Sequence, residues 1–271
     1  MELRETGQCN RSYSLLDHCA VIVFTSNRYS SPQDLWPMPL SVLIPVYNEH
    51  QTIESIILRV LRLDTAKEIV VVDDGSTDGT RDILERLHTK YPETLRCVFH
   101  SSNLGKGAAI RTALAEATGN IIAIQDADLE YHPEDYPAAL KLIEQGYADA
   151  VYGSRFLGPH RVFMYWHYLG NRLLTTLCNL LTGGILSDME TGFKVIRADV
   201  LKNLDVQSYS FDLEVEVTVK LFRFGYRVYE IPITYTGRTY KEGKKVTWKD
   251  GLRALWALGK WGLLVRRRSI R

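Results

Sequence analysis

The chain has 271 residues, of which 45% are hydrophobic and 24% charged, and its formal net charge is +1. This is an ordinary globular composition, long enough to bury a substantial core without disulfides or structural metals. The near-neutral charge gives no indication of nucleic-acid binding. No uncharged apolar run reaches the roughly 18 residues that a membrane span requires. The four cysteines fit no zinc module and indicate free thiols in a reducing compartment.

Residues 1–39 differ from the rest of the chain, because they are polar and show no hydrophobic period. We expect them to form a loosely ordered extension. Met38 stands directly before the first clear strand, and we take it as a candidate for the natural start of the protein.

From Leu40 onward, short apolar runs alternate with segments of helical period. The predicted strands are residues 40–46, 68–72, 95–99, 121–124 and 150–152, and the predicted helices are residues 52–63, 80–90, 106–117 and 133–144. This alternation predicts an α/β fold with a mostly parallel sheet flanked by helices on both faces. In such sheets, ligands bind beyond the carboxyl ends of the strands.

Polar residues cluster at those predicted strand ends. They are residues 47–49, 73–74, 103–107 and 126–128, each group following a different strand. Carboxylates crowded on one rim cost free energy unless a cation offsets them. Oxygen ligands suit magnesium or manganese, so Asp126 and Asp128 predict a divalent metal site.

Two of these loops have structural alternatives. In residues 73–79, a carboxylate could bind a nucleobase or ribose, the polar side chains could cap the next helix, and both can hold at once. Gly105 and Gly107 precede a helix and suggest an anion site. A complete G-x-G-x-x-G motif is missing, because Ile110 stands in place of the third glycine. This disfavours a nicotinamide dehydrogenase, which stays a distant alternative.

Taken together, these motifs resemble the family 2 glycosyltransferases of the GT-A fold over roughly residues 40–250. The matching segments are Pro45–Glu49, Val72–Asp78, Asn103–Gly107, Asp126–Asp128 and Gly153–Arg155. Within the family, the chain looks most similar to the polyprenyl-phosphate sugar transferases, the group of the dolichol-phosphate mannose synthases. The later matches are Asp188–Lys194, Arg238 and the run Gly243-Lys244-Lys245.

The resemblance implies four sets of site residues. The donor-binding set is Pro45, Tyr47, Glu49, Asp74, Lys106, Asp126, Ala127, Asp128, Arg238 and Lys244. The metal set, for Mg²⁺ or Mn²⁺, is Asp126, Asp128 and Glu130. The acceptor-binding set is Arg155 and Arg172, and the catalytic set is Asp128, Asp188 and Arg238.

The chemistry follows from these roles. The metal and the cationic side chains would stabilise the charge that builds on the leaving diphosphate. A lipid phosphate acceptor is already an anion and needs little deprotonation, whereas a hydroxyl acceptor requires a base. Asp188 is the candidate base in that case. Direct displacement would invert the anomeric configuration.

The C-terminal region 248–271 predicts a basic, amphipathic helix. Its apolar face consists of Trp248, Leu252, Leu255, Trp256, Gly259 and Leu263, and Arg266–Arg268 follow the helix. Tryptophan beside basic residues suits a membrane interface, and packing on the core is the alternative. The apolar stretch 165–181 could likewise pack on the core or receive lipid.

The sequence therefore predicts an extension (1–39), a GT-A domain (40–247) and an amphipathic helix (248–271). We expect an inverting, metal-dependent transferase that moves a hexose to polyprenyl or dolichyl phosphate. GDP-mannose is the favoured donor and UDP-glucose the alternative.

The expected location is the cytoplasmic face of a membrane, with peripheral contact. A membrane-protein partner is a further option, and no nucleic-acid partner is expected. A transferase acting on a glycan hydroxyl, although Q-x-x-R-W is absent, and a catalytically silent nucleotide-sugar-binding module remain alternatives.

Overall fold

A computed structural model describes residues 39–65, 67–162, 164–210, 212–239 and 248–265. The predicted extension before Pro39, Lys244 and Arg266–Arg268 lie outside the described residues.

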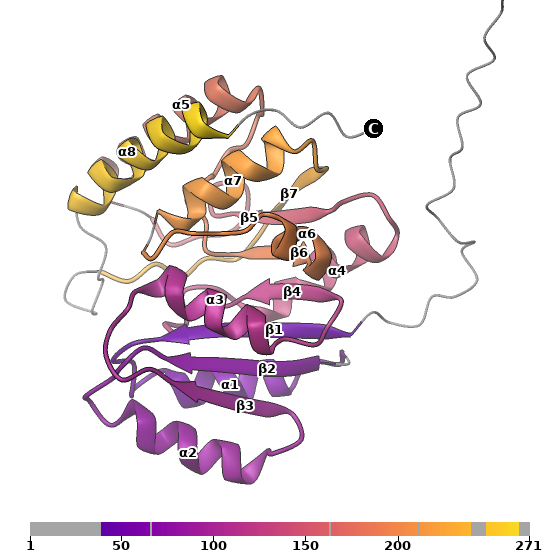
Figure 1. Cartoon of the computed structure of the whole chain (residues 1–271), viewed down its shortest axis with the longest axis vertical. Coiled ribbons are helices and arrows are strands. Elements are labelled where there is room, and N and C mark those ends of the chain that lie inside the picture. Colours follow the sequence, from indigo (N-terminus) through magenta and orange to yellow (C-terminus); the bar gives the residue numbers. More distant parts are fainter. Residues whose placement is uncertain (1–38, 66, 163, 211, 240–247, 266–271) are drawn as a thin grey trace, which may run out of the picture. The chain divides into compact units, whose positions relative to one another are not determined.

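A mixed sheet forms the centre of the fold (Figure 1). Its strands in the described chain are β1 (Leu40–Val46), β2 (Lys67–Asp73), β3 (Leu95–Phe99), β4 (Ile121–Ile124), β5 (Ala150–Ser154), β6 (Lys194–Arg197) and β7 (Val228–Pro232). They are ordered β3-β2-β1-β4-β6-β5-β7. Only β6 runs antiparallel to its neighbours β4 and β5, and the other pairs are parallel. The prediction of a mostly parallel sheet is therefore confirmed.

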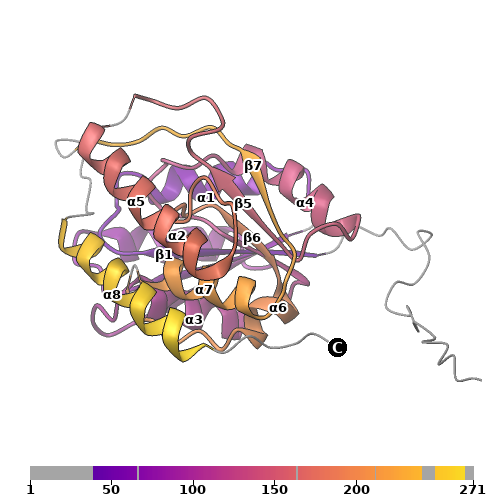
Figure 2. The same ribbon diagram turned by 90° about the horizontal axis from the view of Figure 1, so that it is seen from above.

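Helices cover both faces of this sheet (Figure 2). They are α1 (Ile53–Leu61), α2 (Thr80–Lys90), α3 (Lys106–Glu116), the 3₁₀ turn η1 (Pro133–Asp135), α4 (Tyr136–Glu144), α5 (Tyr165–Thr182), α6 (Ala198–Asn203), α7 (Leu213–Arg223) and α8 (Trp248–Leu264). Helices α1, α2 and α4 share one hydrophobic core with the sheet, and α3, α6 and α7 share the other. Helices α5 and α8 pack on each other and on α7.

The central strand β1 shows why the sheet needs helices on both sides. Its successive side chains point to opposite faces, so Val42 and Ile44 enter one core and Leu43 enters the other. All three are fully buried. Burying a side chain of this size contributes about 1.5 to 3 kcal/mol relative to leaving it exposed. A strand that is apolar on both faces is therefore stable only between two helical layers.

The register of the parallel strands brings the polar loops together. Val46 of β1 pairs with Asp73 of β2, and Leu43 of β1 pairs with Ile124 of β4. The loops that follow β1, β2 and β4 therefore leave the sheet at one edge, as the sequence predicts.

Helix α8 packs on the core with one face, as one of the two alternatives predicts, and contact with a membrane stays a prediction. Ala254, Ala257, Leu258 and Trp261 are buried in the core. The predicted apolar face turns outward instead, with Trp256 64% exposed and Leu263 86% exposed. Among the described residues, no helix combines the length and the apolar character needed to cross a membrane.

Helix α5 adds a second outward apolar surface beside α8. Trp166 is 77% exposed and Leu180 is 77% exposed, while Leu174 and Cys178 on the opposite side of the helix are buried. The stretch 165–181 thus packs on the core with one face and leaves the other uncovered in this chain.

Candidate active site

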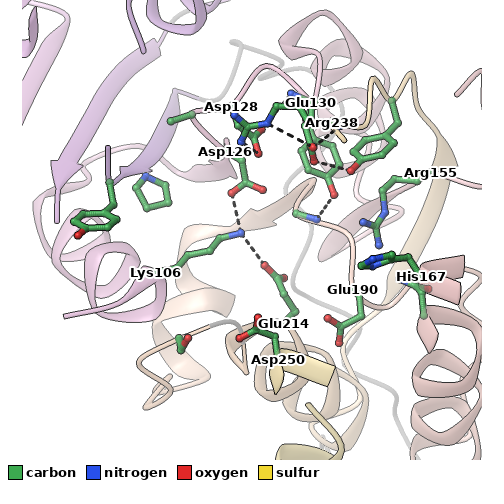
Figure 3. Close-up of a pocket in the computed structure, with 18 of the residues that line it drawn as sticks. Lys106, Asp126, Asp128, Glu130, Arg155, His167, Glu190, Glu214, Arg238 and Asp250 are labelled. Atoms are coloured by element: carbon green, nitrogen blue, oxygen red, sulfur yellow. Dashed lines mark hydrogen bonds and ion pairs between the residues drawn. The ribbon is translucent and has the colours of Figure 1, made fainter. Parts of the chain in front are cut away.

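A pocket of about 920 Å³ opens at the edge where the polar loops converge (Figure 3). The pocket contains every described residue of the predicted donor-binding set: Pro45, Tyr47, Glu49, Asp74, Lys106, Asp126, Ala127, Asp128 and Arg238. Its other wall is formed by Arg155, Phe156 and helix α5. The structure therefore brings the predicted donor and acceptor sides to one cavity.

The loop after β4 places the two aspartates of the D-x-D motif. Strand β4 is fully buried, so the chain turns as it leaves the sheet. Leu129 has a φ of 62°, a left-handed conformation that few residues other than glycine adopt. Such a conformation costs about 1 kcal/mol or more. Asp126, Asp128 and Glu130 all line the pocket, and Glu130 is largely buried there.

Lys106 is the cation that faces Asp126. Its Nζ lies 2.8 Å from Asp126 Oδ1 and 3.2 Å from Glu214 Oε1. Although burial alone would lower the pKa of Lys106, the two carboxylates raise the pKa above its ordinary value. The side chain is therefore a fixed positive charge in the pocket.

Arg238 neutralises the carboxylates on the other side of the motif. Its Nη2 lies 3.0 Å from Asp128 Oδ2 and 3.1 Å from Glu49 Oε1, and its Nη1 lies 3.2 Å from Glu49 Oε2. Burial, followed by the charges of Asp126 and Glu130, raises the pKa of Asp128 to about 7 in spite of Arg238. The positive charge of Arg238 therefore does not fully compensate the burial of Asp128 and the negative charges beside it.

Glu130 is engaged within the protein. Tyr235 donates its hydroxyl proton to Oε2 at 2.6 Å, and the backbone N–H of Arg238 donates to Oε1 at 2.7 Å. In the described residues, no three acidic, histidine or cysteine side chains are arranged to hold a metal ion. The predicted set of Asp126, Asp128 and Glu130 is therefore not a ready-made three-ligand site, because Glu130 anchors the segment that carries Arg238.

Asp74 lines the pocket but also orders the loop 103–107. It accepts hydrogen bonds from the backbone N–H of Leu104 at 2.9 Å and of Gly105 at 2.7 Å, and His100 Nδ1 lies 2.7 Å away. Gly105 has a φ of 98°, and a Cβ there would lie 2.2 Å from the carbonyl oxygen of Tyr209. The close approach requires glycine at this position.

The predicted anion site at the start of α3 is occupied by the protein itself. The backbone N–H groups of Gly107 and Ala108 both donate to the carbonyl oxygen of Tyr209. What this helix contributes to the pocket is the side chain of Lys106. In the loop 73–79, Asp78 accepts a hydrogen bond from the backbone N–H of Thr80 at the start of α2, and Asp74 lines the pocket. The two expected roles of this loop are therefore compatible.

Arg155 and Asp188 form a buried, two-pronged ion pair. Arg155 donates from Nε and Nη2 to the two carboxylate oxygens at 2.7 Å each, and its backbone N–H donates at 3.1 Å. Asn171 of α5 adds a further hydrogen bond to Asp188 at 3.1 Å. A carboxylate with this many partners is the counterion of Arg155, so the geometry argues against the predicted role of Asp188 as a base.

Arg172 lies apart from the other predicted acceptor residue. Its side chain is exposed, its Nη1 is 3.5 Å from the carbonyl oxygen of Ser187, and it does not line the pocket. Arg155, by contrast, lines the pocket. The structure thus supports one of the two predicted acceptor arginines as a pocket residue.

Several pocket residues carry no assigned role in the sequence analysis, and His167, Glu190 and Glu214 are among them. Glu190 belongs to the Asp188–Lys194 match, which is the signal that could have identified it. Glu214 lies on the buried helix α7 between two lysines, because Lys194 also contacts its carboxylate. Nothing local in the sequence indicates that pairing.

The model for glycosyl transferase family 2 matches residues 41–205, which is more than half of the chain. This chain is a member of glycosyltransferase family 2.

Curated relatives of this family 2 protein share about 30% of its residues. It is 30% identical over 240 residues to a dolichol-phosphate mannosyltransferase of Pyrococcus furiosus, covering 83% of this chain but only 64% of that protein. It is 28% identical over 230 residues to a polyprenol monophosphomannose synthase of Mycolicibacterium smegmatis, covering 82% and 86% of the two chains. The family 2 protein thus spans less than two thirds of the Pyrococcus relative.

Solved structures share its fold. A glucosyl-3-phosphoglycerate synthase of Mycobacterium tuberculosis, in complex with Mn²⁺, UDP and phosphoglyceric acid, superposes with a TM-score of 0.65 at 20% identity, covering 83% of this chain and 79% of the other. A mannosyltransferase of Pyrobaculum calidifontis, in complex with GDP-Man and Mn²⁺, gives a TM-score of 0.55 at 24% identity, covering 77% and 59%. At these identities the likeness establishes the GT-A fold alone, and it confirms the predicted fold class.

Proposed function

We propose that this family 2 protein is an inverting, metal-dependent glycosyltransferase that moves a hexose from a nucleotide sugar to a polyprenyl phosphate. GDP-mannose is the favoured donor, and UDP-glucose is the alternative. The observation that carries the proposal is the pocket itself, in which Asp126 and Asp128 face Lys106 and Arg238 across from Arg155. The named functions of the curated relatives support the same reaction.

A divalent metal fits the residues present. Magnesium is usually bound through one or two carboxylates together with substrate phosphates, and not by a complete cage of protein ligands. Asp126 and Asp128 would supply those carboxylates. Burial is the largest cause of the raised pKa of Asp128, and the charges of Asp126 and Glu130, which a cation would offset, add to it. When bound, the metal would withdraw charge from the leaving diphosphate. We assign Glu130 to anchoring the Arg238 segment.

The cations of the pocket, which pair with carboxylates of the protein, would also stabilise the negative charge of a bound donor diphosphate. Lys106 and Arg238 are held by carboxylates at hydrogen-bond distance. A nucleotide diphosphate would bring new negative charge to the same place, and fixed cations stabilise charge that grows on a leaving group. Pro45, Tyr47 and Asp74 would line the nucleoside end, because they lie on the donor wall.

Arg155 is the candidate for holding the acceptor phosphate. It lies on the opposite wall from the donor cations, and Asp188 fixes its guanidinium in place. An arginine held in one orientation pays little conformational entropy on binding an anion. A phosphate oxygen held there would attack the anomeric carbon directly and invert its configuration.

Peripheral contact with the cytoplasmic face of a membrane is part of this proposal. Helices α5 and α8 lie side by side (Figure 2). Both expose apolar side chains, and residues of α5 also line the pocket. Exposed apolar surface beside basic side chains such as Arg253 and Lys260 is typical of a helix that lies on a membrane. An acceptor with a long hydrocarbon tail would be reached at such a surface.

The test is a transfer assay on the purified protein. A short polyprenyl phosphate, Mg²⁺ or Mn²⁺, and labelled GDP-mannose or UDP-glucose are incubated in separate reactions, with a chelator in parallel. We expect label in the lipid phase with one donor, its loss with the chelator, and a product whose anomeric configuration is the inverse of the donor. Metal-dependent nucleotide binding without lipid product from either donor would overturn the lipid-phosphate acceptor.

A further inference from the structure

Lys106 contacts one carboxylate inside the D-x-D motif and one outside it. Its Nζ lies 2.8 Å from Asp126 Oδ1 and 3.2 Å from Glu214 Oε1, which belongs to helix α7 (Figure 3). The start of α3 is fixed, because the backbone N–H of Gly107 donates to the carbonyl oxygen of Tyr209 at 3.0 Å. A change of partner by Lys106 therefore needs movement of its flexible side chain and not of the helix.

Arg238 is paired in the same way on the other side of the motif. Its Nη2 lies 3.0 Å from Asp128 Oδ2 and 3.1 Å from Glu49 Oε1, and its Nη1 lies 3.2 Å from Glu49 Oε2. The backbone N–H of Arg238 donates to Glu130 Oε1 at 2.7 Å, which holds this position of the chain. Each aspartate of the motif thus shares its cation with a carboxylate from a different part of the chain.

The carboxylates inside and outside the motif differ in exposure. The side chains of Asp126 and Asp128 are 21% and 20% exposed. Those of Glu214 and Glu49 are 4% and 10% exposed. A ligand that enters the pocket therefore reaches the two aspartates more readily than the two glutamates.

The two glutamates also have further partners of their own. Lys194, which is fully buried and does not line the pocket, contacts Glu214 Oε2. Thr52 donates its hydroxyl proton to Glu49 Oε2 at 2.9 Å. These contacts hold both glutamates in place independently of the D-x-D motif, so each stays available to its cation whatever the aspartates bind.

This arrangement lowers the free-energy cost of exchanging cations at the motif. Taking a partner away from a buried charge is strongly unfavourable when the charge is left without compensation. Lys106 and Arg238 avoid that cost, since each keeps a glutamate when it leaves an aspartate. A divalent cation bound by Asp126 and Asp128 would repel both side chains, and a donor diphosphate would attract them.

We propose that Glu214 is a positioning residue, which keeps Lys106 in the pocket when Asp126 exchanges that lysine for the divalent metal. Glu49 does the same for Arg238 at the second aspartate of the motif. This rests on the proposed function, which supplies the metal and the diphosphate. The protein's own cations then compete with the metal at the motif, and they serve the donor diphosphate once they are released.

The test measures Mn²⁺ binding to the full-length protein without nucleotide, by electron paramagnetic resonance of the free ion. Lys106→Met removes a competing cation, so it should tighten Mn²⁺ binding by about fivefold or more. Glu214→Gln takes one of two carboxylates from Lys106. The lysine should then hold Asp126 more firmly, and Mn²⁺ should bind about fivefold more weakly.

A double variant separates positioning from a simple effect of charge. Glu214→Gln also removes a negative charge near the metal, which would weaken Mn²⁺ binding in any background. If Glu214 acts through Lys106, adding Glu214→Gln to Lys106→Met should change the Mn²⁺ Kd by less than about twofold. An equal fivefold loss in both backgrounds would overturn the proposal.

Matched variants guard against a loss of folding, which circular dichroism detects. Glu214→Gln leaves the buried Lys194 without its carboxylate. Glu49→Gln, alone and combined with Arg238→Met, repeats the cycle at the other aspartate without touching Lys194, and the same signs are expected. If Glu214→Gln does not fold, the Glu49 cycle decides. Lys141→Met removes an exposed lysine of α4 and should leave the Mn²⁺ Kd unchanged.

A second measurement follows nucleotide binding at saturating Mn²⁺. Lys106→Met should bind GDP or UDP, whichever the wild type binds, about tenfold more weakly, because it lacks a charged hydrogen-bond donor to the diphosphate. Tighter Mn²⁺ binding together with weaker nucleotide binding supports the exchange of partners. Weaker binding of both would overturn it.

The outcomes also separate this proposal from the proposed function. A wild type that binds no Mn²⁺, with or without nucleotide, refutes the metal-dependent function and the exchange together. Independent effects in the double variants refute the exchange alone. A double-variant cycle that behaves as expected, in a protein that transfers nothing to lipid phosphate, refutes the acceptor and supports the exchange.

Discussion

The two walls of the pocket balance charge in opposite ways. On the donor wall, each D-x-D aspartate faces a cation at about hydrogen-bond distance, with Lys106 on Asp126 and Arg238 on Asp128. The carboxylates of these pairs are about 20% exposed, so a ligand can reach them. On the acceptor wall, Arg155 is paired with the fully buried Asp188, and Oε1 of Glu190 has no hydrogen-bond partner among the described residues.

This difference indicates what each wall has to do. The donor wall holds carboxylates and cations that can change partners, which suits an anionic ligand accompanied by a metal. On the acceptor wall, the guanidinium of Arg155 is held in one orientation, and one oxygen of Glu190 has no hydrogen-bond partner among the described residues. The exterior differs too, because α5 and α8 expose apolar side chains beyond the acceptor wall.

The largest expected effect falls on stability at the acceptor wall. Arg155→Ala should lower the free energy of unfolding by about 3 kcal/mol or more, because it leaves Asp188 buried without its cation. Asp188 is fully buried, whereas Arg86 and Glu54 form an exposed pair on the donor half. Arg86→Ala should therefore cost less than about 1 kcal/mol. Urea denaturation of both variants checks this, and equal losses would contradict it.

The next effect falls on catalysis at the donor wall. Asp128→Asn keeps the shape of the side chain but removes a charge that would hold metal and donor, so kcat/KM should fall on the order of 100- to 1,000-fold. Asp82→Asn removes an exposed carboxylate of α2 and serves as the matched control. Initial rates of sugar transfer measure the effect. A loss of less than about fivefold in Asp128→Asn would place the metal elsewhere.

A smaller effect concerns stability and pH at Glu190. The folded pKa of about 7 lies above the ordinary value for an unfolded glutamate, near 4.3. A raised folded pKa gives stability that is present below pH 4 and is lost as pH rises through 7. Glu190→Gln should therefore match wild type at pH 4 and exceed it by about 1 to 3 kcal/mol at pH 8.

Urea denaturation at the two pH values measures that difference. Glu85→Gln, on the exposed surface, should show none. A Glu190→Gln variant that is less stable than wild type at pH 8 would show that the carboxylate has a stabilising partner in the fold.

The smallest effect concerns the outer surface. Trp256→Glu places a charge on the exposed apolar face of α8 and should weaken binding to vesicles containing anionic lipid by about tenfold. Tyr147→Glu alters an exposed aromatic residue at the end of α4, which covers the opposite face of the sheet, and should have little effect. Vesicle co-sedimentation measures both. Equal binding by the two variants would remove α8 from the membrane surface.

Sequence patterns predicted the first half of the fold well because its strands are buried on both faces and end in recognisable turns. The second half contains patterns that mislead. Residues 213–220, Leu-Glu-Val-Glu-Val-Thr-Val-Lys, alternate as a strand would, yet they form the buried helix α7. The helix tolerates its charges because Glu214 meets Lys106 and Lys194, and Glu216 meets Lys220. Those partners become visible only when the chain is folded.

Local sequence patterns also predict only part of the site. Asp126, Asp128 and Arg238 could be placed from motifs, because the loops that carry them follow strands or match a family pattern. Motifs could not predict which of Asp188 and Glu190 pairs with Arg155. The two carboxyls are only two positions apart, and what commits Asp188 is contact with Arg155 and with Asn171 of α5. Tertiary packing, and no local pattern, decides which one is left without a partner.

The contact between Arg238 and Glu49 has a consequence for biosynthesis. The two residues are 189 positions apart, so a ribosome needs about 10 to 40 seconds to travel from one to the other. During that interval, Glu49, Asp128 and Glu130 have been made and the cation that joins them has not. The strands that carry them can pair in the meantime, but the donor site is completed only near the end of translation. A nascent chain that stops before residue 238 would hold most of the sheet and no finished site for a nucleotide sugar.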